Sequence, residues 1–170
     1  YAMAGTRPRV PLYAPVGADR RLALAYSDDG DPLTDVFDFV FVGPGSFSLG
    51  PFEVTTARTA HPVECNAVRL SAAGRSLVYT GDTGPCPRVV ELARGADLLL
   101  AEAAHPEVEG LPGGLHLTGR QAGEHAAEAG VGRLLLTHVP AWVDRIGQLA
   151  DASAVFPETE LVSSGEVYEL

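Results

Sequence analysis

The sequence lacks any hydrophobic run long enough to cross a membrane. Its apolar stretches, such as positions 98–101 and 134–136, have the length of a strand, whereas a membrane helix needs about 20 residues. The first residues do not show the basic, then apolar, then small-residue pattern of a signal peptide. We therefore expect a protein with no membrane partner.

Cysteine is scarce and lysine is absent. The two cysteines, Cys65 and Cys86, form no disulfide framework, and reduced thiols in the cytoplasm are the simpler interpretation, with a disulfide left open. All 12 cationic residues are arginine and the net charge is −10. Such an acidic surface repels phosphate backbones, which argues against a nucleic-acid partner. A small anionic substrate is still compatible with this charge, because a bound metal ion makes the electrostatic potential around it positive.

Several catalytic signatures are also missing. The chain has no Gly-x-Ser-x-Gly elbow, P-loop, Cys-x-x-Cys pair or dinucleotide fingerprint. Its 170 residues, 46% of them hydrophobic, suffice for one globular domain over positions 1–170. Because the chain opens at Tyr1-Ala2-Met3, we expect the polypeptide to continue upstream.

The second half of the sequence alternates between strand and helix patterns. This alternation predicts an α/β fold, a sheet with helices packed on it. A Thr-Gly-Arg-Gln capping box at 118–121 opens one helix and Gly130 ends it. The strands are predicted at 10–13, 37–42, 53–59, 67–70, 76–80, 97–101, 133–137 and beyond Pro157, and the other helices at 20–26, 87–94 and 144–155.

Three ionisable residues follow predicted strands. Asp82, Glu102 and His138 come where sites form in such sheets, at the carboxyl ends of strands. Each also has a structural interpretation. Asp82 could satisfy its own turn, Glu102 could bond a helix N-terminus, and His138 could be a partly buried structural histidine.

Two histidines in loops complete the candidate set. His61 follows a strand and precedes Pro62, while His116 lies in a Gly-rich loop that suits a general acid. Taken singly, each is also compatible with an ordinary loop histidine. We assign no function to His105 or His125.

The order of these motifs resembles the metallo-β-lactamase superfamily, in its ribonuclease Z-like branch. Five segments carry the resemblance: His-Pro-Val-Glu-Cys, Tyr-Thr-Gly-Asp-Thr-Gly-Pro-Cys, Ala-Glu-Ala-Ala, His-Leu-Thr and Leu-Thr-His-Val, at 61–65, 79–86, 101–104, 116–118 and 136–139. The resemblance implies an αββα sandwich. Its N-terminal strands and its first metal motif, His-x-His-x-Asp-His, are missing from these 170 residues. The segment 115–142 is similar to actinobacterial relatives that hydrolyse cyclic nucleotides.

This resemblance implies a site with two divalent metal ions, zinc by default, although manganese or iron accept such ligands. Asp82 would bridge the ions, and His61 and His138 would each bind one. His116 would protonate the leaving alkoxide, positioned by Glu102 or Thr118. The implied activity is that of a phosphodiesterase on a small diester such as a cyclic nucleotide, through a water activated by the two metals.

Alternative functions stay open at this stage. The same metals could serve a lactone, thioester or β-lactam hydrolase. A ribonuclease Z-like nuclease is disfavoured, because the 21 positions from His61 to Asp82 leave no room for the RNA-binding insertion that members of that branch carry there. If the polypeptide starts at Tyr1, a non-catalytic domain without metal is a third option. The substrate is expected to be a small molecule, and a homodimer is an open option for the assembly.

Overall fold

The computed structural model describes residues 8–106 and 114–170. The chain divides into two compact units, of which the first ends at Gly43 and the second begins at Pro44. The interpretation of positions 1–170 as one domain stays a prediction. Within the described residues, no helix is long and apolar enough to span a membrane.

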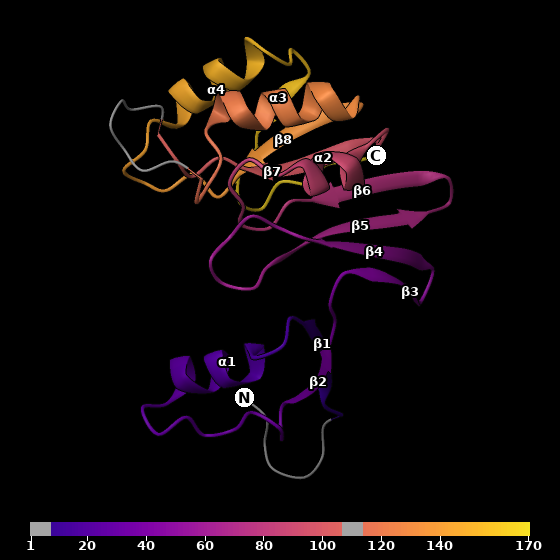
Figure 1. The fold of residues 1–170 in the computed structure, drawn as a ribbon, viewed down its shortest axis with the longest axis vertical. Helices are drawn as coiled ribbons and strands as arrows, with labels where there is room; N and C mark the ends of the chain where they lie inside the picture. The colour runs from indigo at the N-terminus through magenta and orange to yellow at the C-terminus, as the bar shows by residue number, and fades with distance from the viewer. Residues whose placement is uncertain (1–7, 107–113) are drawn as a thin grey trace. The chain divides into compact units, whose positions relative to one another are not determined.

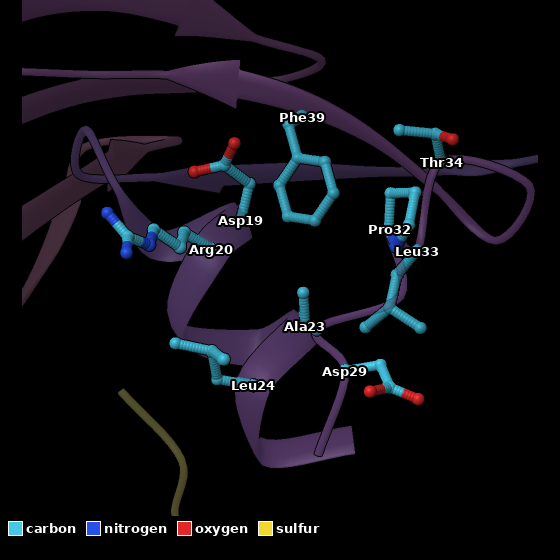
Figure 2. A pocket seen from close by; sticks show the side chains of 10 residues that line it. Asp19, Arg20, Ala23, Leu24, Asp29, Pro32, Leu33, Thr34 and Phe39 are labelled. Atoms are coloured by element: carbon cyan, nitrogen blue, oxygen red, sulfur yellow. The ribbon is translucent and has the colours of Figure 1, made fainter. Parts of the chain in front are cut away.

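The first unit is a small parallel β-α-β arrangement. Strand β1 (Val10–Ala14) pairs in parallel with β2 (Phe37–Phe41), and helix α1 (Ala18–Tyr26) forms the crossover. Beside α1 lies a cavity of about 380 Å³. Figure 2 shows the Phe39 ring and the Ala23 methyl pointing into this space. No residue of the predicted metal site lines this cavity.

The second unit contains one seven-stranded sheet in the order β3-β4-β5-β6-β7-β8-β9 (Figure 1). Its helices are α2 (Pro87–Ala93), α3 (Gly119–Ala129) and α4 (Arg145–Ser153). Its strands are β3 (Gly45–Leu49), β4 (Phe52–Arg58), β5 (Asn66–Ala72), β6 (Arg75–Tyr79), β7 (Leu98–Glu102), β8 (Arg133–Thr137) and β9 (Thr159–Leu161).

The sheet changes from antiparallel to parallel at β6. Strands β3 to β6 pair as antiparallel neighbours, whereas β6, β7, β8 and β9 run parallel, connected through α2, α3 and α4. Because parallel strands end at the same edge, the residues at or just beyond the carboxyl ends of β6, β7 and β8 are brought together. This topology is what places Asp82, Glu102 and His138 at one edge.

The three helices cover one face of the sheet. Alternate residues of β6, β7 and β8 point to this face, and their leucine and valine side chains are fully buried against alanines of α3. Small alanines let the helix approach the sheet closely, so larger strand side chains fill the layer between them. The core residues that carry this contact are Val78, Leu99, Leu134, Leu136, Ala122, Ala126 and Ala129.

Most of the predicted elements are confirmed. Thr118 and Gln121 form both hydrogen bonds of the predicted capping box, and α3 ends at Gly130 in the left-handed conformation. Strand β3 is not among the predicted strands, because Gly43-Pro44-Gly45 is interpreted as a turn alone, although the alternating Ser-Phe-Ser-Leu that follows indicates a strand. The predicted loop at positions 110–114 lies, apart from Gly114, outside the described residues.

Candidate metal centre

The structure brings the predicted histidines and Asp82 together at the edge of the sheet. Potential ligand atoms of His61, Asp82 and His116 all lie within 4.8 Å of one another. His138 joins them through its Nδ1 atom, which lies 2.9 Å from Oδ1 of Asp82. The ring centroid of His116 is 5.6 Å from that of His61 and 5.7 Å from that of His138. Residues from four separate loops therefore converge on one partly exposed site.

His138 has an unusual backbone conformation. Its φ of +56° lies in the left-handed region, which costs a residue with a side chain about 1–2 kcal/mol. It follows directly after β8, whose last residue, Thr137, accepts a hydrogen bond from the Ala103 N–H through its carbonyl oxygen. Backbone strain of this kind persists where the surroundings impose it, and it is concentrated at functional sites. The strain therefore supports a functional interpretation of His138.

Glu102 is fully buried and accepts three hydrogen bonds. Its Oε1 atom accepts from the His116 ring at 2.8 Å and from the Thr83 backbone N–H at 2.7 Å, and its Oε2 atom accepts from the Ala104 N–H at 3.2 Å. Because a carboxylate only accepts, Nδ1 of His116 carries the proton. Glu102 thus fixes both the ring orientation and the tautomer of His116, leaving its Nε2 atom for chemistry.

The position before Asp82 requires glycine, because atoms of Cys65 and Asn66 lie too close for a side chain. Gly81 has a φ of +59°, and a Cβ atom there would lie 2.8 Å from Sγ of Cys65 and 3.2 Å from the carbonyl oxygen of Asn66. Any other residue would combine a left-handed conformation with a steric clash. The turn that presents the Asp82 carboxylate therefore depends on this glycine.

His125 is a buried residue of α3 whose role the sequence did not indicate. Its Nε2 atom accepts a hydrogen bond from the Cys86 N–H at 3.1 Å, and its Nδ1–H donates to the Gln121 carbonyl oxygen at 2.8 Å. Burial lowers the pKa of His125, although the Gln121 hydrogen bond and the nearby Glu128 and Glu124 oppose that shift. The residue therefore links α3 to the start of α2 as a neutral imidazole.

This link predicts a measurable pH dependence of stability. Since folding lowers the pKa of His125, the unfolded chain binds its proton more tightly, and the free energy of unfolding falls as the pH drops below the ordinary value of about 6.5. His125→Gln keeps an acceptor for Cys86 but does not titrate, so urea denaturation at pH 7.5 and 5.5 should show a smaller pH dependence. His125→Phe removes the acceptor and should cost about 1–3 kcal/mol at pH 7.5. An unchanged pH dependence in His125→Gln would contradict this assignment.

The donor set fits a divalent metal ion. Imidazole nitrogens and carboxylate oxygens are among the ligands that zinc takes in proteins, and catalytic zinc sites combine about three protein ligands with a water molecule. The group His61, Asp82 and His116 supplies three ligand atoms, and His138 contacts Asp82 directly. Either histidine could therefore accompany His61 and Asp82 as a ligand, and the division of roles predicted from the sequence, with His138 as the ligand, stays a prediction.

The comparison with protein families identifies the class of this chain. The family described as Beta-lactamase superfamily domain matches residues 2–139. The chain belongs to this family and has the metallo-β-lactamase fold, as the order of its motifs predicted.

Two relatives are similar to most of this chain. An uncharacterized protein of Mycobacterium leprae is 40% identical over 173 residues, which cover 97% of this chain and 61% of the relative. The probable metallo-hydrolase YhfI of Bacillus subtilis is 36% identical over 124 residues, covering 72% of this chain and 50% of YhfI. The crystal structure of YhfI matches 98% of this chain and 68% of its own, with a TM-score of 0.80 and 29% identity.

A third relative is named for a nuclease activity. The ribonuclease Z of Brevibacillus brevis is 45% identical over 97 residues, which cover 52% of this chain and 30% of that protein. The chain thus spans half to three-fifths of the length of the curated M. leprae and B. subtilis relatives, and still less of the ribonuclease.

Proposed function

We propose that this chain is part of a metal-dependent phosphodiesterase that hydrolyses a small phosphodiester such as a cyclic nucleotide. The observation that carries the proposal is the convergence of His61, Asp82 and His138 beside a histidine that is held by a buried carboxylate. Two divalent ions, zinc by default, would lower the pKa of a water molecule and offset the charge of the phosphoryl oxygens. Asp82 would contact both ions, and His61 and His138 one each.

The proposed proton donor is His116. Its Nδ1–H donates to Glu102, so Nε2 of the neutral ring carries no proton. Nε2 would deliver a proton to the leaving oxygen of the diester after taking one up from solvent, and the Glu102 carboxylate would stabilise the imidazolium that forms in between. The competing assignment makes His116 a metal ligand, because its ring lies within the same group as His61 and Asp82. The metal content of His116→Ala separates the two: a proton donor can be removed without loss of metal, whereas a ligand cannot.

The charge of the chain supports a small substrate over a polynucleotide. A net charge of −10 disfavours the many phosphate contacts by which proteins hold RNA.

The relatives support the reaction class of the proposal. The relative named ribonuclease Z supports phosphodiester chemistry, and the family as a whole supports hydrolysis. Both cysteines are free in the structure, which supports the proposed location in the cytoplasm, where thiols stay reduced.

The test compares two reaction classes in the intact polypeptide. After loading with zinc or manganese, we expect hydrolysis of a cyclic nucleotide and of bis(p-nitrophenyl) phosphate, with at least about a tenfold lower kcat/KM for a simple lactone, because a site that stabilises a phosphoryl transition state would stabilise that of a carbonyl less well. Metal analysis should give about two equivalents per chain. Faster lactone hydrolysis would replace the proposal with its carbonyl alternative, and a protein that binds no metal would support a non-catalytic domain.

A further inference from the structure

Thr83 lies at the junction of three loops that form the candidate site. It follows Asp82 directly and is fully buried. Its backbone N–H donates to Oε1 of Glu102 at 2.7 Å. The turn that carries Asp82 is thereby bonded to the same carboxylate oxygen that holds the ring of His116.

The hydroxyl of Thr83 makes a second connection, toward the loop of His61. Its Oγ1 atom accepts a hydrogen bond from the Ala60 N–H at 3.1 Å and donates to the Gly84 carbonyl oxygen at 2.7 Å. The Gly84 N–H in turn donates to the Ala60 carbonyl oxygen at 2.9 Å. Ala60 directly precedes His61, so these bonds connect the backbone at His61 to the backbone at Asp82.

We propose that Thr83 is a positioning residue that sets the separation of His61 from Asp82 and thereby the metal affinity of the site. The inference rests on the proposed function, because it requires both residues to bind metal. Ala60 and Thr83 lie in two short turns that extend from the ends of β4 and β6, where the regular strand pairing has ended. The buried hydroxyl replaces such pairing, since it satisfies one donor and one acceptor at a point that water cannot reach. Groups that orient the ligands of a metal typically change its affinity 10–100-fold.

A purely structural role would have a different signature. A buried hydroxyl with two hydrogen bonds stabilises any fold, and its loss would lower stability without changing how the remaining folded protein binds metal. The structure offers a matched control in Thr56 of β4, which is also buried and whose hydroxyl donates to the Gly45 carbonyl oxygen at 3.3 Å. Thr56 touches neither the turn of Asp82 nor Ala60 through that bond.

The experiment measures zinc affinity by competition with a fluorescent chelator, alongside urea denaturation of the metal-free intact polypeptide. Thr83→Val keeps the side-chain shape but loses the hydroxyl, and we expect zinc affinity to fall about 10–100-fold. Thr83→Ser keeps the hydroxyl and should stay within about threefold of wild type. Thr56→Val should also lose stability, because it loses a hydrogen bond, while its zinc affinity is unchanged.

The outcomes separate this proposal from the proposed function. If wild type binds zinc and hydrolyses a phosphodiester, but Thr83→Val binds zinc as tightly as Thr56→Val does, the positioning role is overturned and the function stands. If wild type binds no zinc, both are overturned. Should Thr83→Val not fold, Thr83→Ser and Thr83→Ala replace it. Both lack the methyl group and differ only in the hydroxyl, so equal zinc affinities would again overturn the positioning role.

Discussion

Replacement of Asp82 by alanine is expected to abolish metal-dependent hydrolysis, lowering kcat/KM by at least about 10³-fold, or about 4 kcal/mol of transition-state stabilisation. Asp82 is the one carboxylate in the group with His61 and His116, and it also contacts His138. Its removal takes the only negative charge out of this donor group. We therefore expect Asp82→Ala to lose at least one of two metal equivalents, as measured by metal analysis after gel filtration.

The control for this prediction is a destabilised variant outside the site. Asp144 is the N-terminal cap of α4, where its side chain accepts from the Ile146 N–H. Asp144→Ala should cost about 0.5–2 kcal/mol of stability and keep its activity and metal. If Asp82→Ala retains full activity and metal content, the assignment of this carboxylate as a ligand is wrong, and the proposed function loses its central residue.

The positions of the candidate residues are predictable because they follow from local patterns. Apolar strands are visible as short runs of Leu and Val, and parallel strands must end at one edge. The amino-acid sequence alone therefore suffices to group Asp82, Glu102 and His138. The predicted pairing of Glu102 with His116 is present as a 2.8 Å hydrogen bond, although the catalytic roles of both residues stay predictions.

The connections between loops are not predictable in this way, because they join residues far apart in the sequence. Thr83 bonds to Ala60 across 23 positions, and Cys86 bonds to His125 across 39. No periodicity or spacing indicates such contacts, and a histidine in the middle of α3 has no local signal that distinguishes packing from positioning. The left-handed conformation of His138 is equally a product of its surroundings.

Substitution of Glu102 is expected to have the second large effect, a fall in kcat whose size should depend on the leaving group of the substrate. The carboxylate is fully buried and accepts three N–H donors. Glu102→Ala would leave these donors unsatisfied and cost several kcal/mol of stability, at about 1–3 kcal/mol for each. Glu102→Gln is the gentler variant, since an amide oxygen can still accept from His116 and Thr83 at the Oε1 position.

A catalytic role of Glu102 can be distinguished from a role in stability by comparing a leaving group that needs a proton with one that does not. An alkoxide leaving group, as in a cyclic nucleotide, departs only with proton donation, whereas p-nitrophenolate is stable without it. If Glu102 holds His116 for that donation, Glu102→Gln should lower kcat for the cyclic nucleotide about 100-fold and for bis(p-nitrophenyl) phosphate less than about tenfold. The same ratio is expected in His116→Ala. Equal losses on the two substrates in both variants would mean that the pair maintains the site, or binds metal, without moving a proton.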